Sequence, residues 1–198
     1  MAAGGLPAGY RLLWLLYTVH PPGAPPRRWR GLVGYGRLDI AARFLLAALY
    51  PGGKLLDDSA LFLFLDRGGS VGEGILFEPR CLPEAMDSEA EAGELLLAAL
   101  RGRGGCSMVP DASLRGLLLA ARRRGYRVVL LSEEGGPINA HRDVSYVLVV
   151  GSRVDPPRDL PVDEAWRIGC MPYLASTVAA YINLELRAMR QLWGHDEG

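Results

Sequence analysis

The stretches YRVVLL at residues 126–131 and YVLVV at residues 146–150 decide the fold class of this chain. The first contains the apolar run Val-Val-Leu-Leu and the second is apolar throughout, and a glycine borders each stretch, Gly125 before the first and Gly151 after the second. Strands that are apolar on both faces are typical of a parallel sheet buried between layers of helices. The sequence therefore predicts an α/β fold, with a mainly parallel sheet and helices on both faces.

The rest of the chain alternates between short apolar runs and segments with helical periodicity. We expect further strands at residues 10–20, 60–65, 74–78 and 166–170. We expect helices at residues 38–50, 87–100, 110–124 and 172–192, with Ser88 as a cap. Residues 1–9 are predicted to be a flexible tail, and the 198 residues suit a single domain.

Composition excludes some classes of protein. The net charge is zero, so the chain is not a uniformly basic nucleic-acid binder. Lys54 is the single lysine, and nearly all positive charge is arginine, which binds phosphate bidentately; a coding bias explains this equally well. The odd cysteine count (Cys81, Cys106 and Cys170) shows no disulfide framework and no metal-binding spacing. We therefore expect a soluble cytoplasmic protein without a metal and without a membrane partner.

The segment GRLDIAAR at residues 36–43 opens the first expected helix. Asp39 and Arg43 are four residues apart and share a helix face, and Arg37 directly precedes the helix. One interpretation is a helix-start ion pair worth about 0.3–0.5 kcal/mol, and the spacing by itself favours it. The other is an anion clamp combined with a carboxylate that orients or deprotonates a reacting group.

Small residues follow three of the later strands. Ser132, Gly151 and Gly169 lie in these loops, where a missing or short side chain lets the backbone approach a ligand. In parallel sheets ligands bind beyond the carboxyl ends of the strands. The loops predict a ligand pocket, although three ordinary turns would have the same spacing.

Arginine groups form possible RNA contacts. Arg28 and Arg30 flank Trp29, which is a possible platform for base stacking. Further arginines occur at residues 101–103 and 122–124. Each group taken alone is more often a solvated surface.

The GRLDIAAR segment resembles the GRLDxxxR signature of the archaeal tRNA (pseudouridine-54-N1)-methyltransferase family of the SPOUT superfamily, and the similarity extends over about residues 10–190. It implies a SPOUT-type fold with a C-terminal deep trefoil knot, S-adenosylmethionine as methyl donor, tRNA as substrate and a homodimer. It assigns catalysis to Asp39 and Arg37 and RNA binding to Arg43. The donor contacts implied by the resemblance are Leu131, Gly151, Ile168, Gly169, Cys170, Met171, Pro172, Tyr173 and Ala180.

The chain departs from this family at two places. Ser152 stands where the family often has aspartate, and small or apolar residues at 175–179 replace polar ones. Two alternatives therefore stay open. One is a ribosomal RNA pseudouridine N1-methyltransferase, and the other is a non-catalytic knotted protein that binds RNA.

Overall fold

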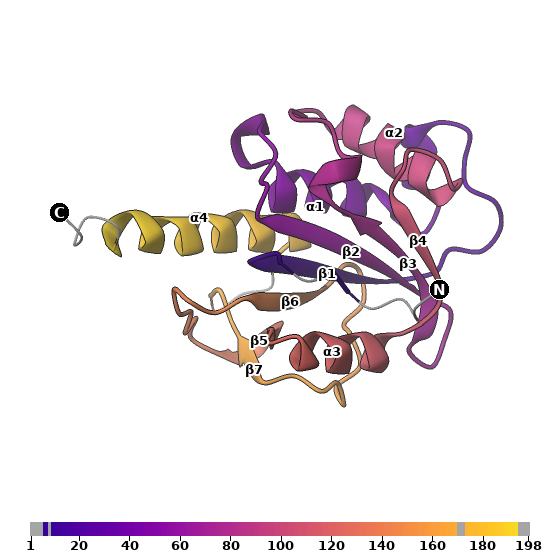
Figure 1. Ribbon diagram of the computed structural model, residues 1–198. Helices are drawn as coiled ribbons and strands as arrows, with labels where there is room; N and C mark the ends of the chain where they lie inside the picture. Colours follow the sequence, from indigo (N-terminus) through magenta and orange to yellow (C-terminus); the bar gives the residue numbers. More distant parts are fainter. Residues whose placement is uncertain (1–5, 8, 170–172, 194–198) are drawn as a thin grey trace.

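The computed structural model describes residues 6–7, 9–169 and 173–193, and it is built around one seven-stranded sheet (Figure 1). In the order β4-β3-β2-β1-β6-β5-β7, the strands run side by side across this sheet. Their bounds are β1 Leu12–Val19, β2 Ser59–Asp66, β3 Val71–Phe77, β4 Ser107–Ser113, β5 Arg127–Gly136, β6 Tyr146–Gly151 and β7 Glu164–Trp166. The helices are α1 Asp39–Leu49, α2 Glu89–Leu100, α3 Leu114–Arg123 and α4 Ala175–Trp193, with short 3-10 turns η1 Trp29–Leu32, η2 Pro51–Gly53 and η3 Pro79–Cys81.

Parallel pairing dominates the sheet, as predicted. The central strand β1 is parallel to both β2 and β6, and β5 is parallel to both β6 and β7. The edge formed by β3 and β4 is antiparallel. All parallel strands therefore end at the same edge of the sheet, which is where ligands bind in such folds.

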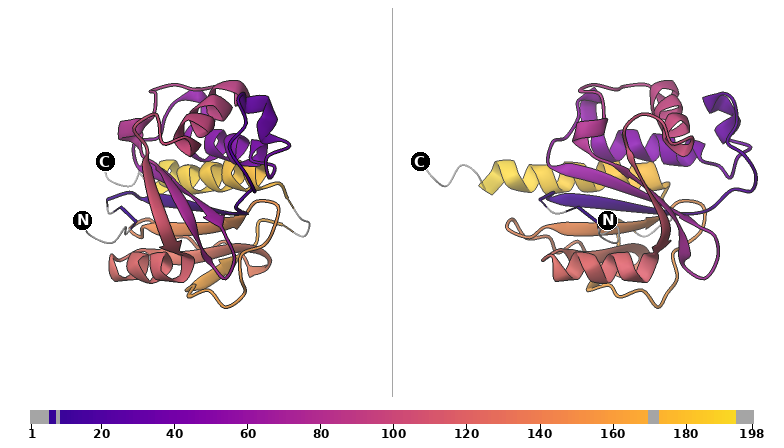
Figure 2. Two further views of the ribbon diagram at one scale, coloured as in Figure 1. Left: turned by 90° about the vertical axis from the view of Figure 1, so that its right-hand side faces the viewer. Right: turned by 45° about the vertical axis from the view of Figure 1, so that its right-hand side comes forward.

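Helices cover both faces of the sheet, which confirms the predicted layers. Helices α1, α2 and α4 lie on one face and α3 on the other (Figures 1 and 2). Alternate residues of β1 supply the two cores: Trp14 packs with the first group of helices, whereas Leu13 and Leu15 pack on the side of α3. This double burial explains why the central strands are apolar throughout.

The helix expected at residues 110–124 begins later, at Leu114. Residues 107–113 form the edge strand β4 instead, and the side chain of Ser113 caps α3 by accepting a hydrogen bond from the N–H of Gly116 at 3.2 Å. Pro110 is tolerated there because β4 has a neighbour on one side only. Mostly exposed side chains give β4 no apolar alternation, so its sequence carried no strand signal.

Part of the expected N-terminal tail is packed. Leu6 is only 1% exposed and belongs to the core on the α3 side. The hydroxyl of Tyr126 donates to the carbonyl oxygen of Pro7 at 3.1 Å. The prediction of a flexible tail is therefore wrong for these two residues.

Cys81 and Cys106 form a disulfide across 25 residues, which corrects the expectation that the cysteines are unpaired. Cys81 ends η3 just after β3, and Cys106 precedes β4. Because β3 and β4 are hydrogen-bonded neighbours, they bring the two cysteines together although the sequence separates them. The disulfide joins the two ends of the segment at residues 82–105, which carries α2 and is called the excursion between β3 and β4 below.

In the described part of the chain, no helix is both long enough and apolar enough to cross a membrane.

Candidate functional site

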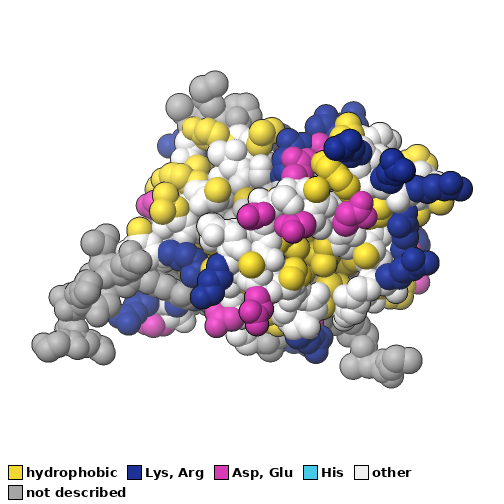
Figure 3. All heavy atoms as spheres, turned by 90° about the horizontal axis from the view of Figure 1, so that it is seen from above, with side chains coloured by type: hydrophobic (Ala, Val, Ile, Leu, Met, Phe, Trp, Pro, Cys, Tyr) yellow, Lys and Arg dark blue, Asp and Glu magenta, His cyan; other side chains and the backbone are white. Residues whose placement is uncertain are grey.

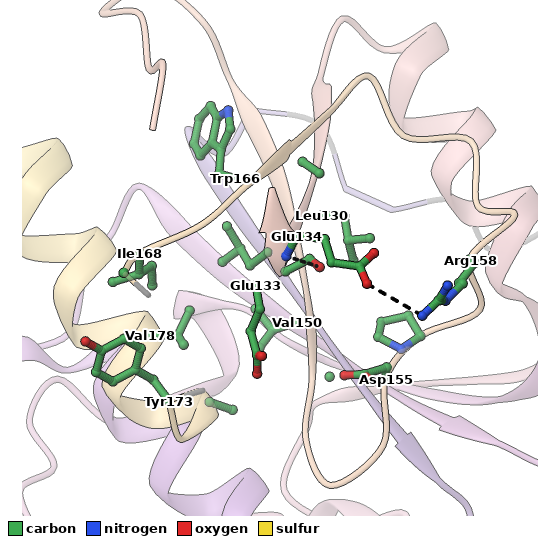
Figure 4. A pocket seen from close by; sticks show the side chains of 17 residues that line it. Leu130, Glu133, Glu134, Val150, Asp155, Arg158, Trp166, Ile168, Tyr173 and Val178 are labelled. Atoms are coloured by element: carbon green, nitrogen blue, oxygen red, sulfur yellow. Dashed lines mark hydrogen bonds and ion pairs between the residues drawn. The ribbon is translucent and has the colours of Figure 1, made fainter. Parts of the chain in front are cut away.

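A pocket of about 470 Å³ lies beyond the carboxyl ends of β5, β6 and β7 (Figure 4). This volume falls within the range of about 300–1,000 Å³ that is usual for small-ligand sites. Apolar side chains, among them Leu130, Val150 and Val178, form much of its wall, and Trp166 lies behind them. The first turn of α4 closes one side.

The pocket exists because β5 separates from β6 partway along its length. The two strands pair up to Leu130, opposite Val149. Beyond that point β5 pairs only with β7, where Leu131 and Gly136 both lie opposite Trp166. Residues 132–135 therefore bulge out of the strand, and β5 is longer than the predicted strand at residues 126–131.

Gly151 has a steric reason to be glycine. A Cβ atom at this position would lie 2.5 Å from the carbonyl oxygen of Val154, so the chain folds back tightly against it. The next residue, Ser152, donates its backbone N–H to the carbonyl oxygen of Tyr17 at 2.9 Å. The end of β6 thus presents bare backbone to the pocket and is held in place by β1.

The structure brings most of the expected donor contacts together. The described ones that line the pocket are Leu131, Gly151, Ile168, Gly169 and Tyr173. Cys170, Met171 and Pro172 lie outside the described residues, as does that part of the expected strand at residues 166–170. Ala180 is separate, because it lines a second hollow between α1 and α4.

The charged side chains of the pocket are mostly acidic. Glu133, Glu134 and Asp155 line it together with one arginine, Arg158. Arg158 lies 3.7 Å from Glu134, which leaves Glu133 and Asp155 without an ion-pair partner in the described part of the chain. Such a pocket disfavours phosphate-bearing ligands and suits a neutral or cationic one.

The GRLDIAAR segment forms a compact cluster at the start of α1. Arg37 donates two hydrogen bonds to the Asp39 carboxylate, from Nε at 3.0 Å and from Nη2 at 3.1 Å. Arg43 contacts the same carboxylate and also lies 3.7 Å from Glu89 on α2. Arg37 adopts a φ of 59°, which is unfavourable for a residue with a side chain and costs about 1–2 kcal/mol. The cluster is thus more than the simple i,i+4 pair that the spacing favoured.

The two arginines set the protonation of Asp39, whose side chain is only 4% exposed. Burial acts to raise the pKa of its carboxyl group, but the hydrogen bonds and charges of Arg37 and Arg43 outweigh burial and lower the pKa below 3.8. Asp39 is therefore a stable carboxylate at neutral pH and a weak base.

The cluster and the pocket lie at the same edge of the sheet. The loop that carries Arg37 follows the carboxyl end of β1, and Tyr17 near that end pairs with Gly151 of the pocket. Helix α1 also packs along α4, whose first turn borders the pocket. The cluster does not line the pocket itself, so the two are neighbouring parts of one edge.

Trp29 is packed rather than free. It lies against Gly93 of α2, where an added Cβ would be 2.9 Å from the Trp29 Cβ, and the guanidinium of Arg30 lies 5.7 Å from its ring centre. Trp29 therefore packs between η1 and α2 and is partly exposed, and its predicted role as a base-stacking platform stays a prediction.

The arginines around Trp29 form an exposed group. Arg28 and Arg30 are exposed, and Arg101 joins them by donating a hydrogen bond to the carbonyl oxygen of Pro26. Figure 3 shows dark-blue side chains gathered on its right-hand side, over the loop before α1 and the end of α2. The sequence placed these arginines in separate groups, and the fold joins them.

The second hollow measures about 710 Å³ and includes Arg43, Ala180 and Leu184. Leu184 is 68% exposed although it is a large apolar residue. Asn183 beside it is buried and donates to the carbonyl oxygens of Ala47 and Ala48, but its own Oδ1 accepts no hydrogen bond among the described residues. Sequence reasoning missed this face, because α4 shows only the mixed pattern of an ordinary amphipathic helix.

These features define a class of protein: an α/β fold whose parallel strands end at a pocket for a small, non-anionic ligand, beside an arginine-rich face suited to an anionic macromolecule.

Comparisons with known proteins identify the family. The model of a family described as "Putative SAM-dependent RNA methyltransferase" matches residues 13–162, which is most of the chain, and the chain belongs to this family. The protein is therefore an RNA methyltransferase that depends on S-adenosylmethionine. No curated protein matches the sequence.

A solved structure shares the fold. The crystal structure of Archaeoglobus fulgidus Nep1 bound to S-adenosylhomocysteine superimposes with a TM-score of 0.60 at 18% identity, and the match covers 92% of this chain and 99% of that one. S-adenosylmethionine, on which members of this family depend, carries a positively charged sulfonium and suits the described pocket, which combines an apolar wall with unpaired carboxylates and has no basic side chain other than the paired Arg158.

Proposed function

We propose that this protein methylates N1 of pseudouridine 54 in tRNA. The pocket at the ends of β5, β6 and β7 holds the methyl donor, and the Arg37–Asp39–Arg43 cluster holds the acceptor. The observation that carries this proposal is that the pocket and the cluster lie at one edge of the sheet, where the pairing of β1 with β6 joins them. The signature at residues 36–43, which resembles that of the tRNA family, supports the choice of substrate.

S-adenosylmethionine supplies a methyl group on a sulfonium sulfur. In the transfer, the S–CH₃ bond breaks, a bond from N1 to that carbon forms, and N1 loses its proton. Arg37 stabilises the negative charge that develops on the base, because its side chain is 45% exposed while Asp39 fixes its guanidinium.

Asp39 acts as an orienting group in this proposal. A carboxylate with a lowered pKa accepts a proton poorly, so the N1 proton leaves to solvent water. The carboxylate instead fixes both arginines, and Arg43 binds a neighbouring phosphate. The exposed Arg28 and Arg30 extend the phosphate-binding surface.

A second copy of the chain completes the assembly. The hollow between α1 and α4 exposes Leu184 and leaves the buried Oδ1 of Asn183 unsatisfied, as expected for a surface that another subunit covers. Arg43 lines this hollow and also pairs with Asp39, so the acceptor site borders the dimer interface. The deep trefoil knot implied by the resemblance belongs to the same proposal.

The test is methylation of defined RNAs with a labelled donor. The substrates are a tRNA with pseudouridine at position 54, the same tRNA with uridine there, and a ribosomal RNA hairpin with a pseudouridine. We expect 1-methylpseudouridine only in the first. A product only in the hairpin would favour the ribosomal alternative. Donor binding without transfer to any RNA would favour the non-catalytic one.

A further inference from the structure

The pocket carries an excess of negative charge close to where the donor is proposed to bind. Glu133 lies on the bulge of residues 132–135, and both ends of this bulge are fixed opposite Trp166. A Cβ on Gly135 would lie 2.5 Å from the backbone carbon of Trp166, so the bulge is packed tightly against β7. In Figure 4 the Glu133 side chain projects into the space between Tyr173 and Val150.

Asp155 adds a second carboxylate from the opposite wall. Its Cα lies 3.2 Å from the position of a Cβ on Gly151, which places it beside the end of β6. Neither Glu133 nor Asp155 is paired in the described part of the chain, and the one arginine of the pocket is matched with Glu134.

We propose that Glu133 and Asp155 make the pocket select the positively charged methyl donor over its neutral product. S-adenosylmethionine and S-adenosylhomocysteine share the adenosine and the amino-acid tail, and they differ by one methyl group and the positive charge of the sulfonium. Backbone contacts at the strand ends recognise what the two share, so they do not distinguish donor from product. The carboxylates respond to the charge, which disappears with transfer, and so weaken product inhibition. This inference rests on the donor position given in the proposed function.

The experiment is titration calorimetry with three ligands on the intact protein. They are S-adenosylmethionine, S-adenosylhomocysteine and sinefungin, which carries an ammonium group in place of the sulfonium. We expect Glu133→Gln and Asp155→Asn each to weaken both cationic ligands about three- to tenfold and to leave the neutral product nearly unchanged. In the wild type, the preference for the cationic ligands should shrink as salt is raised from about 0.05 to 0.5 M.

Asp111→Asn is the matched control. Asp111 is highly exposed on the edge strand β4, so its replacement changes the net charge equally, far along the sheet from the pocket. It should leave all three affinities unchanged. An equal loss for all three ligands in Glu133→Gln and Asp155→Asn would overturn the proposal, because it would indicate hydrogen bonds to the shared adenosine. Unchanged affinities would overturn it as well. If the wild type binds none of the three ligands, the proposed donor site is wrong. That result differs from the two above, which contradict only the selection by charge.

Discussion

Arg37, Asp39 and Arg43 show how a few side chains acquire a role that their spacing does not reveal. Arg37 adopts a left-handed backbone conformation, and this turns its guanidinium onto Asp39 in a bidentate pair. A purely structural helix start would not need that strain, since Asp39 already pairs with Arg43 one turn later. The strain is explained if Arg37 must be held at a fixed position for the acceptor base.

Replacement of Asp39 by asparagine tests this role. We expect Asp39→Asn to lower kcat by about 10²-fold or more, because both arginines lose their anchor, while calorimetry shows unchanged donor binding. The folded pKa of Asp39 lies below the unfolded one, so the stability that this carboxylate contributes is present above about pH 4 and is lost as pH falls through the lower folded value. The difference in Tm between the wild type and Asp39→Asn should thus be constant from about pH 8 to 5 and shrink below about pH 4.

A pH–rate profile separates the two possible roles of Asp39. An acidic limb near pH 6 that disappears in Asp39→Asn would show that Asp39 accepts the proton with a raised pKa, contrary to its orienting role.

At the scale of elements, the excursion between β3 and β4 supports the acceptor side of the molecule. Its helix α2 packs on Trp29 through Gly93 and places Glu89 beside Arg43. Arg101, which directly follows α2, contacts the loop before α1. The Cys81–Cys106 disulfide closes the base of this excursion. The proposed donor pocket lies on β5, β6, β7 and α4, and none of its described lining residues belongs to this excursion.

Opening the disulfide should therefore destabilise the fold and weaken RNA binding. A crosslink of this loop length contributes about 3 kcal/mol, which corresponds to a Tm about 6–12 °C lower after reduction. Calorimetric melts with and without a phosphine reductant measure this, and RNA affinity should fall while donor affinity stays the same. The control is the double variant Cys81→Ala/Cys106→Ala. Its Tm should equal that of the reduced wild type and should not change when the reductant is added. An unchanged Tm on reduction would show that the excursion is held by packing alone.

At the scale of the whole molecule, the face between α1 and α4 is the strongest candidate for self-association. It combines the exposed Leu184, the unsatisfied Asn183 Oδ1 and the motif residue Arg43 in one hollow. The acceptor cluster at its border would then be shared between subunits.

An aspartate at position 184 should split the dimer. We expect Leu184→Asp to sediment as a monomer, because a buried unpaired charge costs several kcal/mol at an interface, and to lose methyl transfer. The control is Val71→Asp, an equivalent change at an exposed position on β3, which should sediment like the wild type. A monomeric wild type that is fully active would refute both the interface and its role.

The sequence by itself determined most of the elements of this protein, with the edge strand β4 and the bulge of β5 as exceptions. Parallel strands buried on both faces are apolar at successive positions, so the runs at residues 128–131 and 146–150 predicted the parallel sheet. Local capping likewise fixed the start of α2 at Ser88, whose side chain accepts a hydrogen bond from the N–H of Glu91. The GRLDIAAR segment marked the Arg37–Asp39–Arg43 cluster because its members are neighbours along the chain.

Tertiary structure alone decided the features that join distant residues. The divergence of β5 from β6 opens the pocket and brings Glu133 to it, and pairing of β3 with β4 brings Cys81 to Cys106. The fold also packs Trp29 against Gly93 of α2, and it places Ala180 in the hollow between α1 and α4, away from the pocket at the ends of β5, β6 and β7. Periodicity reports which face of an element is buried but not what it is buried against, so these contacts exist only once the sheet order is set.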